Sequence, residues 1–193
     1  MLLMRLRLLR KAGKEKLVII PFIITFANAC LGLLSVLYAW DEQFMAAAYC
    51  IIAAAFFDGI DGRVARALGL TSLLGMELDS LCDAVSFCVA PALILYSWKL
   101  YSINVIGLIA ISLYLCAGLF RLAKFNGVGI EQKQFFNGLP TTMAASLVAV
   151  LVIVSPRLAQ SWFYFVLEPY YLVIFVTCLA LLMLSMIRFP SFK

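Results

Sequence analysis

Four aspartates are spaced along the chain so that they could act as one group. Asp58 and Asp61 are three residues apart, and Asp79 and Asp83 are four residues apart. In an α-helix, either separation places both side chains of a pair on the same face. Carboxylate oxygens are preferred ligands of hard divalent ions such as Mg²⁺, Mn²⁺ and Ca²⁺. Two facing pairs could therefore hold two such ions, an arrangement suited to clamping phosphoryl groups.

In a chain of this composition, a cluster of acidic side chains is energetically unfavourable. Of the 193 residues, 65% are hydrophobic and 13% are charged, and the mean hydropathy is +1.06. These values exclude a disordered chain, a coiled coil and an ordinary cytosolic enzyme. Each carboxylate in the middle of a membrane costs about 2.5–3.5 kcal/mol, so four without partners would cost roughly 10–14 kcal/mol. We therefore expect cations, bases or water to neutralise them.

Other residue types restrict the chemistry further. The chain has no histidine, which removes the commonest general base and leaves carboxylate, lysine, tyrosine or cysteine side chains for that role. The six cysteines include no C-x-x-C pair, and all of them fall in apolar segments. Small packing residues are therefore favoured over a zinc site or a disulfide framework.

Six apolar stretches are long enough to cross a membrane as helices, which takes about 20 residues each. They are residues 17–40, 44–67, 72–97, 103–122, 139–156 and 163–187. The expected fold is an all-α integral membrane protein with six transmembrane helices. The second and third stretches carry the four aspartates and are joined by a short break. An antiparallel pair of helices would bring the carboxylates together. Asp83 would then lie about 16 Å along the third helix, near the middle of the bilayer.

The distribution of bases predicts the orientation. The net charge is +5, and residues 1–16 carry six bases and one acid, while the remainder of the chain balances nine of each. With the N-terminus in the cytoplasm, 13 bases fall in inner segments and two, Lys99 and Arg157, in outer ones. Lys and Arg are enriched in cytoplasmic loops, so both termini are predicted to be cytoplasmic.

The N-terminal segment is considered separately from the membrane domain, residues 17–193. Residues 1–16 form a basic juxtamembrane segment, which indicates contact with an anionic membrane surface rather than nucleic acid. A loose pattern of leucines among the bases leaves an interfacial amphipathic helix possible. A signal peptide cleaved near Ala29 is the alternative, although the apolar run continues to Trp40 and is longer than usual for such a peptide.

Residues 58–83 carry a longer motif around the aspartates. It reads D-x2-D-G-x2-A-R-x8-G-x3-D-x3-D. This motif resembles the signature of the CDP-alcohol phosphatidyltransferase superfamily at all eight defining positions. The resemblance extends over about residues 17–145. Further segments resemble the integral-membrane CDP-diacylglycerol–serine O-phosphatidyltransferases, namely residues 77–87, 89–92, 121–126 and 136–142, together with the first-helix pattern of Pro21, Thr25, Asn28 and Gly32.

The resemblance implies an enzyme that transfers the phosphatidyl group of CDP-diacylglycerol to the hydroxyl of L-serine and releases CMP. Two Mg²⁺ or Mn²⁺ ions would hold the pyrophosphate, and Asp83 would also be the general base. The metal ligands would be Asp58, Asp61, Asp79 and Asp83. The implied nucleotide or phosphate contacts are Gly62, Ala65, Arg66 and Gly75, with Asn28 as a further candidate. Family members are usually homodimers, and the implied location is the cytoplasmic membrane of a bacterium or archaeon, with the site facing the cytoplasm.

Several of these candidate contacts have a second interpretation. The small residues could instead serve close helix packing, and Arg66 could be a base that extends to the membrane surface. The carboxylate of serine needs a base, for which Arg121 and Lys124 are candidates, but both could be charges that fix the orientation. Asn126 and Asn28 could contact substrate or satisfy backbone groups between helices.

Four rival functions remain open from the sequence. Within the superfamily, the acceptor could be glycerol 3-phosphate or inositol phosphate, as in phosphatidylglycerophosphate or phosphatidylinositol-phosphate synthases. The donor could carry an ether lipid, as in an archaetidylserine synthase. Outside the superfamily, intramembrane carboxylates could belong to an ion or proton transporter, but these acids form no path across the bilayer. A purely structural membrane protein would have no reason to carry them.

Overall fold

The computed structural model describes residues 22–68, 73–127, 138–160 and 162–185. All regular structure within these ranges is helical, without any strand. The helices are Phe22–Trp40, α2 (Phe44–Leu68), α3 (Leu73–Asp83), η1 (Ala84–Val89), α4 (Ala90–Trp98), η2 (Leu100–Ile103), α5 (Asn104–Gly127), α6 (Thr141–Ala159), η4 (Trp162–Leu167) and α7 (Pro169–Leu184).

Five helical stretches are long and apolar enough to cross a membrane, which confirms most of the predicted pattern. They are Phe22–Trp40, Phe44–Val64, Leu73–Trp98, Leu100–Asn126 and Thr141–Ala159. The sixth predicted stretch contains α7, which is apolar but has only 16 residues. At 1.5 Å per residue it is about 24 Å long, shorter than the bilayer core of roughly 30 Å. The predicted count of six spans is therefore met only in part.

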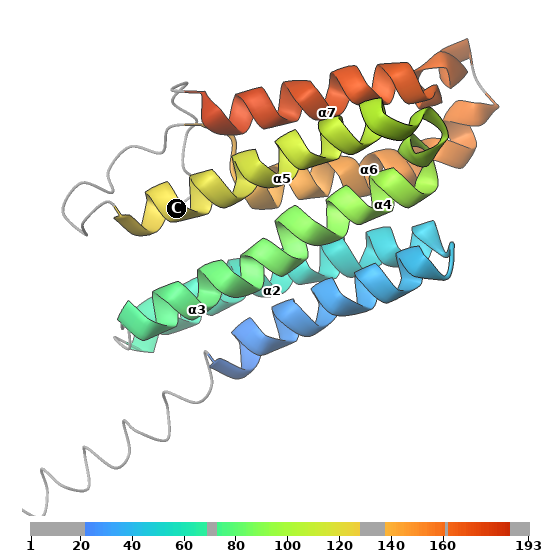
Figure 1. The fold of residues 1–193 in the computed structure, drawn as a ribbon. Coiled ribbons are helices and arrows are strands. Elements are labelled where there is room, and N and C mark those ends of the chain that lie inside the picture. The colour runs from blue at the N-terminus through green and yellow to red at the C-terminus, as the bar shows by residue number, and fades with distance from the viewer. Residues whose placement is uncertain (1–21, 69–72, 128–137, 161, 186–193) are drawn as a thin grey trace, which may run out of the picture.

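Successive helices run back and forth along one bundle (Figure 1). The start of the Phe22–Trp40 helix, the end of α2 and the start of α3 lie at one end of the bundle. The ends of α5 and α7 reach the same end, and α6 starts there. The turns that follow the first helix, α4 and α6 lie at the opposite end. The predicted antiparallel arrangement of the two aspartate-bearing helices is therefore present.

Two groups of buried apolar side chains hold the bundle together. One group lies among α4, α5, α6 and α7 and includes Tyr114 and Leu172. The other joins the Phe22–Trp40 helix, α2, η1, α4 and α6, and is rich in alanines such as Ala47 and Ala145. Small side chains allow helix backbones to approach closely, which is how helices pack in membranes without a hydrophobic driving force.

The third span differs from the continuous helix that the sequence predicts. The π-helical segment η1 interrupts it directly after Asp83, and α4 begins with Pro91 in its first turn. Proline has no N–H to donate to the carbonyl four residues earlier, which belongs to Phe87. The Tyr114 hydroxyl of α5 donates to that carbonyl at 3.0 Å instead. The irregular turn is thus tied to a neighbouring helix at the depth where the last aspartate stands.

Candidate metal and active site

Three of the four aspartates meet between α2 and α3. Asp58 and Asp61 come from α2 and Asp79 from α3, and one carboxylate oxygen of each lies within 4.8 Å of the others. Asp61 is only 4% exposed, and the other two are half-buried. Separate helices therefore present acids to one point, as predicted, but the cluster contains three of the four aspartates.

Asp83 stands apart from this group of three. It is the last residue of α3, one turn beyond Asp79, and is buried. Its Oδ1 accepts a hydrogen bond of 3.0 Å from Nδ2 of Asn28, on the Phe22–Trp40 helix. It is still close enough to interact electrostatically with Asp58 and Asp79. The structure therefore separates a cluster of three carboxylates from a fourth that has its own partner.

The three clustered carboxylates fit a hard divalent cation. Two oxygens on opposite sides of Mg²⁺ or Ca²⁺ are separated by about 4–5 Å, twice the usual metal–oxygen distance, which matches the spread of this cluster. Oδ1 of Asp79 is buried and has no hydrogen-bond partner among the described residues. A buried acceptor of this kind calls for a ligand. The donor set consists of oxygens only, which favours Mg²⁺, Mn²⁺ or Ca²⁺ over softer metals.

Hydroxyl groups from two other helices hold the α2 carboxylates. Thr25 Oγ1, from the Phe22–Trp40 helix, donates to Asp61 Oδ2 at 3.2 Å. Thr142 Oγ1, from α6, donates to Asp58 Oδ2 at the same distance of 3.2 Å. From the sequence, Thr25 is a position of the first-helix pattern that could contact substrate or satisfy backbone groups, and Thr142 has no role of its own. The signal for Thr142 was its place in the segment 136–142, one of those that carry the family resemblance.

Asn28 links the first helix to the third span through both its side chain and its backbone. Beyond its bond to Asp83, its carbonyl accepts a hydrogen bond of 2.9 Å from the Ser86 hydroxyl of η1. The two helices approach closely at this point, because a Cβ on Gly32 would lie only 2.7 Å from Cα of Ser86. Asn28 is fully buried, and its Oδ1 has no partner among the described residues. Asn28, a predicted nucleotide contact, is thus also the hydrogen-bond partner of Asp83.

The three candidate residues for serine binding occupy different environments on α5. Arg121 is half-buried, interacts electrostatically with Asp83, and has a buried Nε without a hydrogen-bond partner in the described structure. Lys124 is exposed. Asn126 is also exposed, and its Oδ1 accepts a hydrogen bond of 3.0 Å from Ser80 of α3. Of the three, Arg121 is the one that the described contacts relate to an aspartate of the site.

The remaining motif positions lie on the same two helices. Gly62 follows Asp61 in α2, Gly75 is one turn before Asp79 in α3, and both are half-buried. The predicted roles of Ala65 and Arg66 concern side chains that lie outside the described residues.

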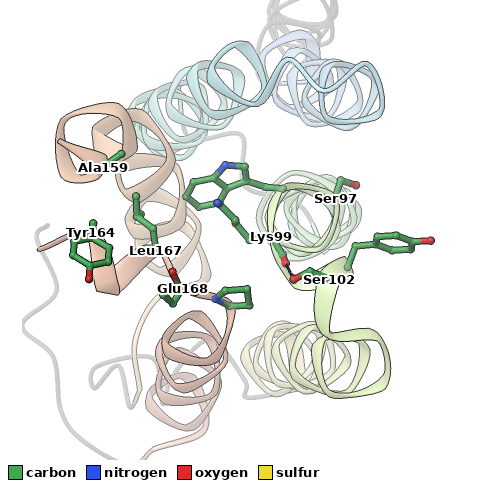
Figure 2. Close-up of a pocket in the computed structure, with 10 residues that line it drawn as sticks. Ser97, Lys99, Ser102, Ala159, Tyr164, Leu167 and Glu168 are labelled. Carbon is green, nitrogen blue, oxygen red and sulfur yellow. Dashed lines mark hydrogen bonds between the residues drawn. The ribbon is translucent and has the colours of Figure 1, made fainter. Parts of the chain in front are cut away.

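A separate cavity lies at the opposite end of the bundle (Figure 2). Its volume is about 540 Å³, and its lining residues come from the ends of α4 and α6, from η2 and η4, and from the start of α7. Lys99 and Glu168 are its charged residues, and both are exposed. None of the four aspartates lines this cavity, so the cavity and the acidic cluster are separate features.

Comparison with known proteins gives an independent result. Residues 18–184 match the CDP-alcohol phosphatidyltransferase family. The chain is 36% identical over 181 residues to the CDP-diacylglycerol–serine O-phosphatidyltransferase of Helicobacter pylori, covering 92% of this chain and 74% of that protein. It is 38% identical over 176 residues to the Bacillus subtilis protein of the same name, covering 90% and 91%. It is 32% identical over 173 residues to the archaetidylserine synthase of Methanothermobacter thermautotrophicus, covering 89% and 69%.

Proposed function

Because this chain belongs to the CDP-alcohol phosphatidyltransferase family, we propose that it transfers the phosphatidyl group of CDP-diacylglycerol to the hydroxyl of L-serine and releases CMP. The observation that carries the proposal is the cluster of Asp58, Asp61 and Asp79 in a chain whose similar relatives are named for this reaction. Bound divalent cations would supply charge neutralisation at the pyrophosphate during transfer. The carboxylates fit Mg²⁺ or Mn²⁺, and we propose two ions, with Asp83 as a fourth ligand.

Asp83 is the proposed general base. It takes the proton from the serine hydroxyl while that oxygen forms a bond to the lipid-side phosphorus. The bond from this phosphorus to the bridging oxygen of the pyrophosphate breaks, and CMP leaves with the electron pair. The hydrogen bond from Asn28 Nδ2 fixes one oxygen of Asp83 and leaves the other for the proton. The sequence has no histidine, and among the remaining candidates for the base a carboxylate lies in the site itself.

Arg121 is the proposed partner of the serine carboxylate. Its guanidinium is half-buried and interacts electrostatically with Asp83, which supports a serine bound between Arg121 and the base. A guanidinium binds carboxylates through two parallel hydrogen bonds, which also orients the acceptor. Lys124 and Asn126 are secondary candidates at the end of the same helix. Gly62, Ala65, Arg66 and Gly75, together with Asn28, are the proposed nucleotide and phosphate contacts.

The chain is an integral membrane protein, as its five apolar helices and its family require. We propose that α7, with flanking residues, completes a six-helix domain over residues 17–193, and that both termini and the site face the cytoplasm. The positive-inside distribution of bases supports this orientation. Residues 1–16 are proposed to lie along the anionic inner surface of a bacterial or archaeal cytoplasmic membrane. The family resemblance also supports a homodimer.

The experiment that tests the function uses the purified chain in detergent. It is supplied with CDP-diacylglycerol, Mn²⁺ or Mg²⁺, and one labelled acceptor at a time: L-serine, glycerol 3-phosphate or inositol phosphate. We expect CMP release and a labelled lipid with serine only, and no turnover after metal removal with EDTA. Turnover with another acceptor, but not with serine, would overturn the acceptor assignment and leave the family intact.

An archaetidylserine synthase is the second candidate, because one relative at 32% identity carries that name. The two candidates share the acceptor and differ in the lipid of the donor. A parallel assay with the CDP derivative of an ether lipid separates them. A kcat/KM that is higher for the ether-lipid donor than for CDP-diacylglycerol would select this alternative.

A further inference from the structure

α6 carries none of the family's eight motif positions, yet it contributes to the metal cluster. Thr142 stands in its first turn, 84 residues from Asp58, and donates its hydroxyl hydrogen to Oδ2 of that aspartate at 3.2 Å. A threonine near a helix start often bonds its own backbone. Here the carbonyl of Thr142 accepts from Ser146 at 2.7 Å, and the hydroxyl of Thr142 is directed to another helix.

The packing of α6 on α2 fixes this contact. Ala54 lies one turn before Asp58, Ala145 lies one turn after Thr142, and both are fully buried in the same apolar group. These small side chains permit a close approach of the two helices. The hydroxyl and the carboxylate therefore meet in a register that apolar packing sets independently of the hydrogen bond.

The start of α6 is also fixed from its other side, by the end of α7. The N–H of Leu139 donates to the carbonyl of Leu182 at 3.0 Å. Gly138, which precedes it, has φ of +88°, and a Cβ there would lie 2.5 Å from the carbonyl oxygen of Met183. Only glycine fits this turn without strain. The last helix thus helps to determine where Thr142 stands.

We propose that Thr142 is a positioning residue for the metal site, a role that rests on the proposed function. Its hydroxyl holds Oδ2 of Asp58 and leaves the other oxygen of that carboxylate directed to the cation. Partners that hydrogen-bond metal-ligating carboxylates typically change metal affinity by roughly 10–100-fold when they are removed. The expected effect therefore appears in cation binding before any substrate is present.

The test measures Mn²⁺ binding to the purified chain without substrate, from the loss of the free-ion EPR signal. Thr142→Val removes the hydroxyl at nearly constant shape and should weaken binding at least tenfold, taking the lower end of that range. Thr142→Ser keeps a hydroxyl and should bind within a few-fold of the unmodified chain. Thr141→Val is the matched control, because Thr141 is the neighbouring buried threonine and packs near Gly118 rather than on an aspartate. If Thr142→Val does not fold, Thr142→Ala provides the same comparison.

The outcomes separate this proposal from the function itself. Unchanged Mn²⁺ affinity in Thr142→Val, in a chain that binds Mn²⁺ and makes the serine lipid, overturns the role of Thr142 alone. Equal weakening of Mn²⁺ binding by Thr142→Ser and Thr142→Val also overturns it, because the hydroxyl kept by serine would then not contribute to binding. A failure of the unmodified chain to bind Mn²⁺ at all contradicts the proposed metal-dependent function instead.

Discussion

The two ends of the bundle carry acidic side chains in opposite ways. At one end, Asp61 and Asp83 are buried, and each accepts a hydrogen bond from the Phe22–Trp40 helix. At the other end, Asp41, Glu42 and Glu168 are exposed beside turns. A cavity of about 540 Å³ lies at this second end, around Lys99 and Glu168 (Figure 2). Exposed acids interact with water and need no partner, whereas buried ones persist only with compensation.

This difference shows that the burial and hydrogen bonding of acidic side chains identify the site, whereas the presence of a cavity alone does not. A cavity of about 540 Å³ is large enough for a ligand. Its two charged residues are exposed, however, as charged residues at solvated helix ends commonly are. The aspartates are instead gathered by α2 and α3 and supported by hydroxyl and amide groups of other helices. Burying these carboxylates costs folding stability, and their retention despite that cost indicates a function.

The largest expected effect comes from changing an aspartate at the buried end. Asp83→Asn preserves the oxygen that accepts from Asn28 and removes the proposed base. We expect kcat to fall by about 10²–10⁴-fold, the usual contribution of a general base. Binding of CMP in the presence of Mn²⁺, measured by calorimetry, should be retained better in Asp83→Asn than in Asp58→Asn.

Two results would break this part of the comparison. Equal loss of CMP binding in both variants would contradict a separate base role for Asp83. Glu168→Gln is the matched acid-to-amide control at the exposed end, where Glu168 precedes α7 and its side chain forms no cap. Its kcat should stay near that of the unmodified chain. A large loss of kcat in Glu168→Gln would contradict the placement of the active site at the aspartates.

A smaller effect is expected from Arg121, which belongs to the buried end but is not a metal ligand. Arg121→Ala removes the proposed partner of the serine carboxylate. A hydrogen bond to a charged group contributes about 1.5–3 kcal/mol, so KM for serine should rise by roughly 10–100-fold. KM for CDP-diacylglycerol should change much less, because that substrate does not use this contact.

Lys124→Ala is the control for Arg121→Ala, since Lys124 is an exposed base one turn further along α5. Steady-state kinetics with serine and the lipid varied in turn measures both constants. An unchanged KM for serine in Arg121→Ala would remove Arg121 from the acceptor pocket, and an equal rise in Lys124→Ala would assign the effect to overall charge.

Much of this architecture is predictable from local sequence rules. Runs of apolar residues predict the spans, and the helical repeat predicts that all four aspartates can meet, of which the structure clusters three. What the sequence does not predict is contact between distant segments. The bonds of Thr142 to Asp58 and of Asn28 to Asp83 depend on which helices become neighbours, and no local periodicity carries that information. The 3-10 helix η4 before α7 is likewise not revealed by an apolar run.

The break in the third span is an intermediate case. Pro91 marks a place where one carbonyl loses its usual donor, so an irregularity there could be expected from the sequence. Which group compensates could not, since Tyr114 lies on another helix, 27 residues from Phe87. The same loss of a donor occurs inside α6, at Pro156. There the replacement donor is local: Ser155 Oγ bonds the carbonyl of Val152 at 2.7 Å.

These two proline sites extend the comparison to backbone carbonyls, and they give its smallest expected effects. Tyr114→Phe and Ser155→Ala each remove one hydroxyl from a carbonyl that proline has left without its usual donor. An unsatisfied buried acceptor costs about 1–3 kcal/mol, so both variants should unfold at lower temperature in detergent. Only Tyr114→Phe should also lower kcat, by a few-fold, because the η1 turn that Tyr114 holds follows Asp83 directly and contains Ser86. Equal specific activity in the two variants, measured well below their unfolding temperatures, would contradict the coupling of η1 to the base and leave Tyr114 with a role in stability alone.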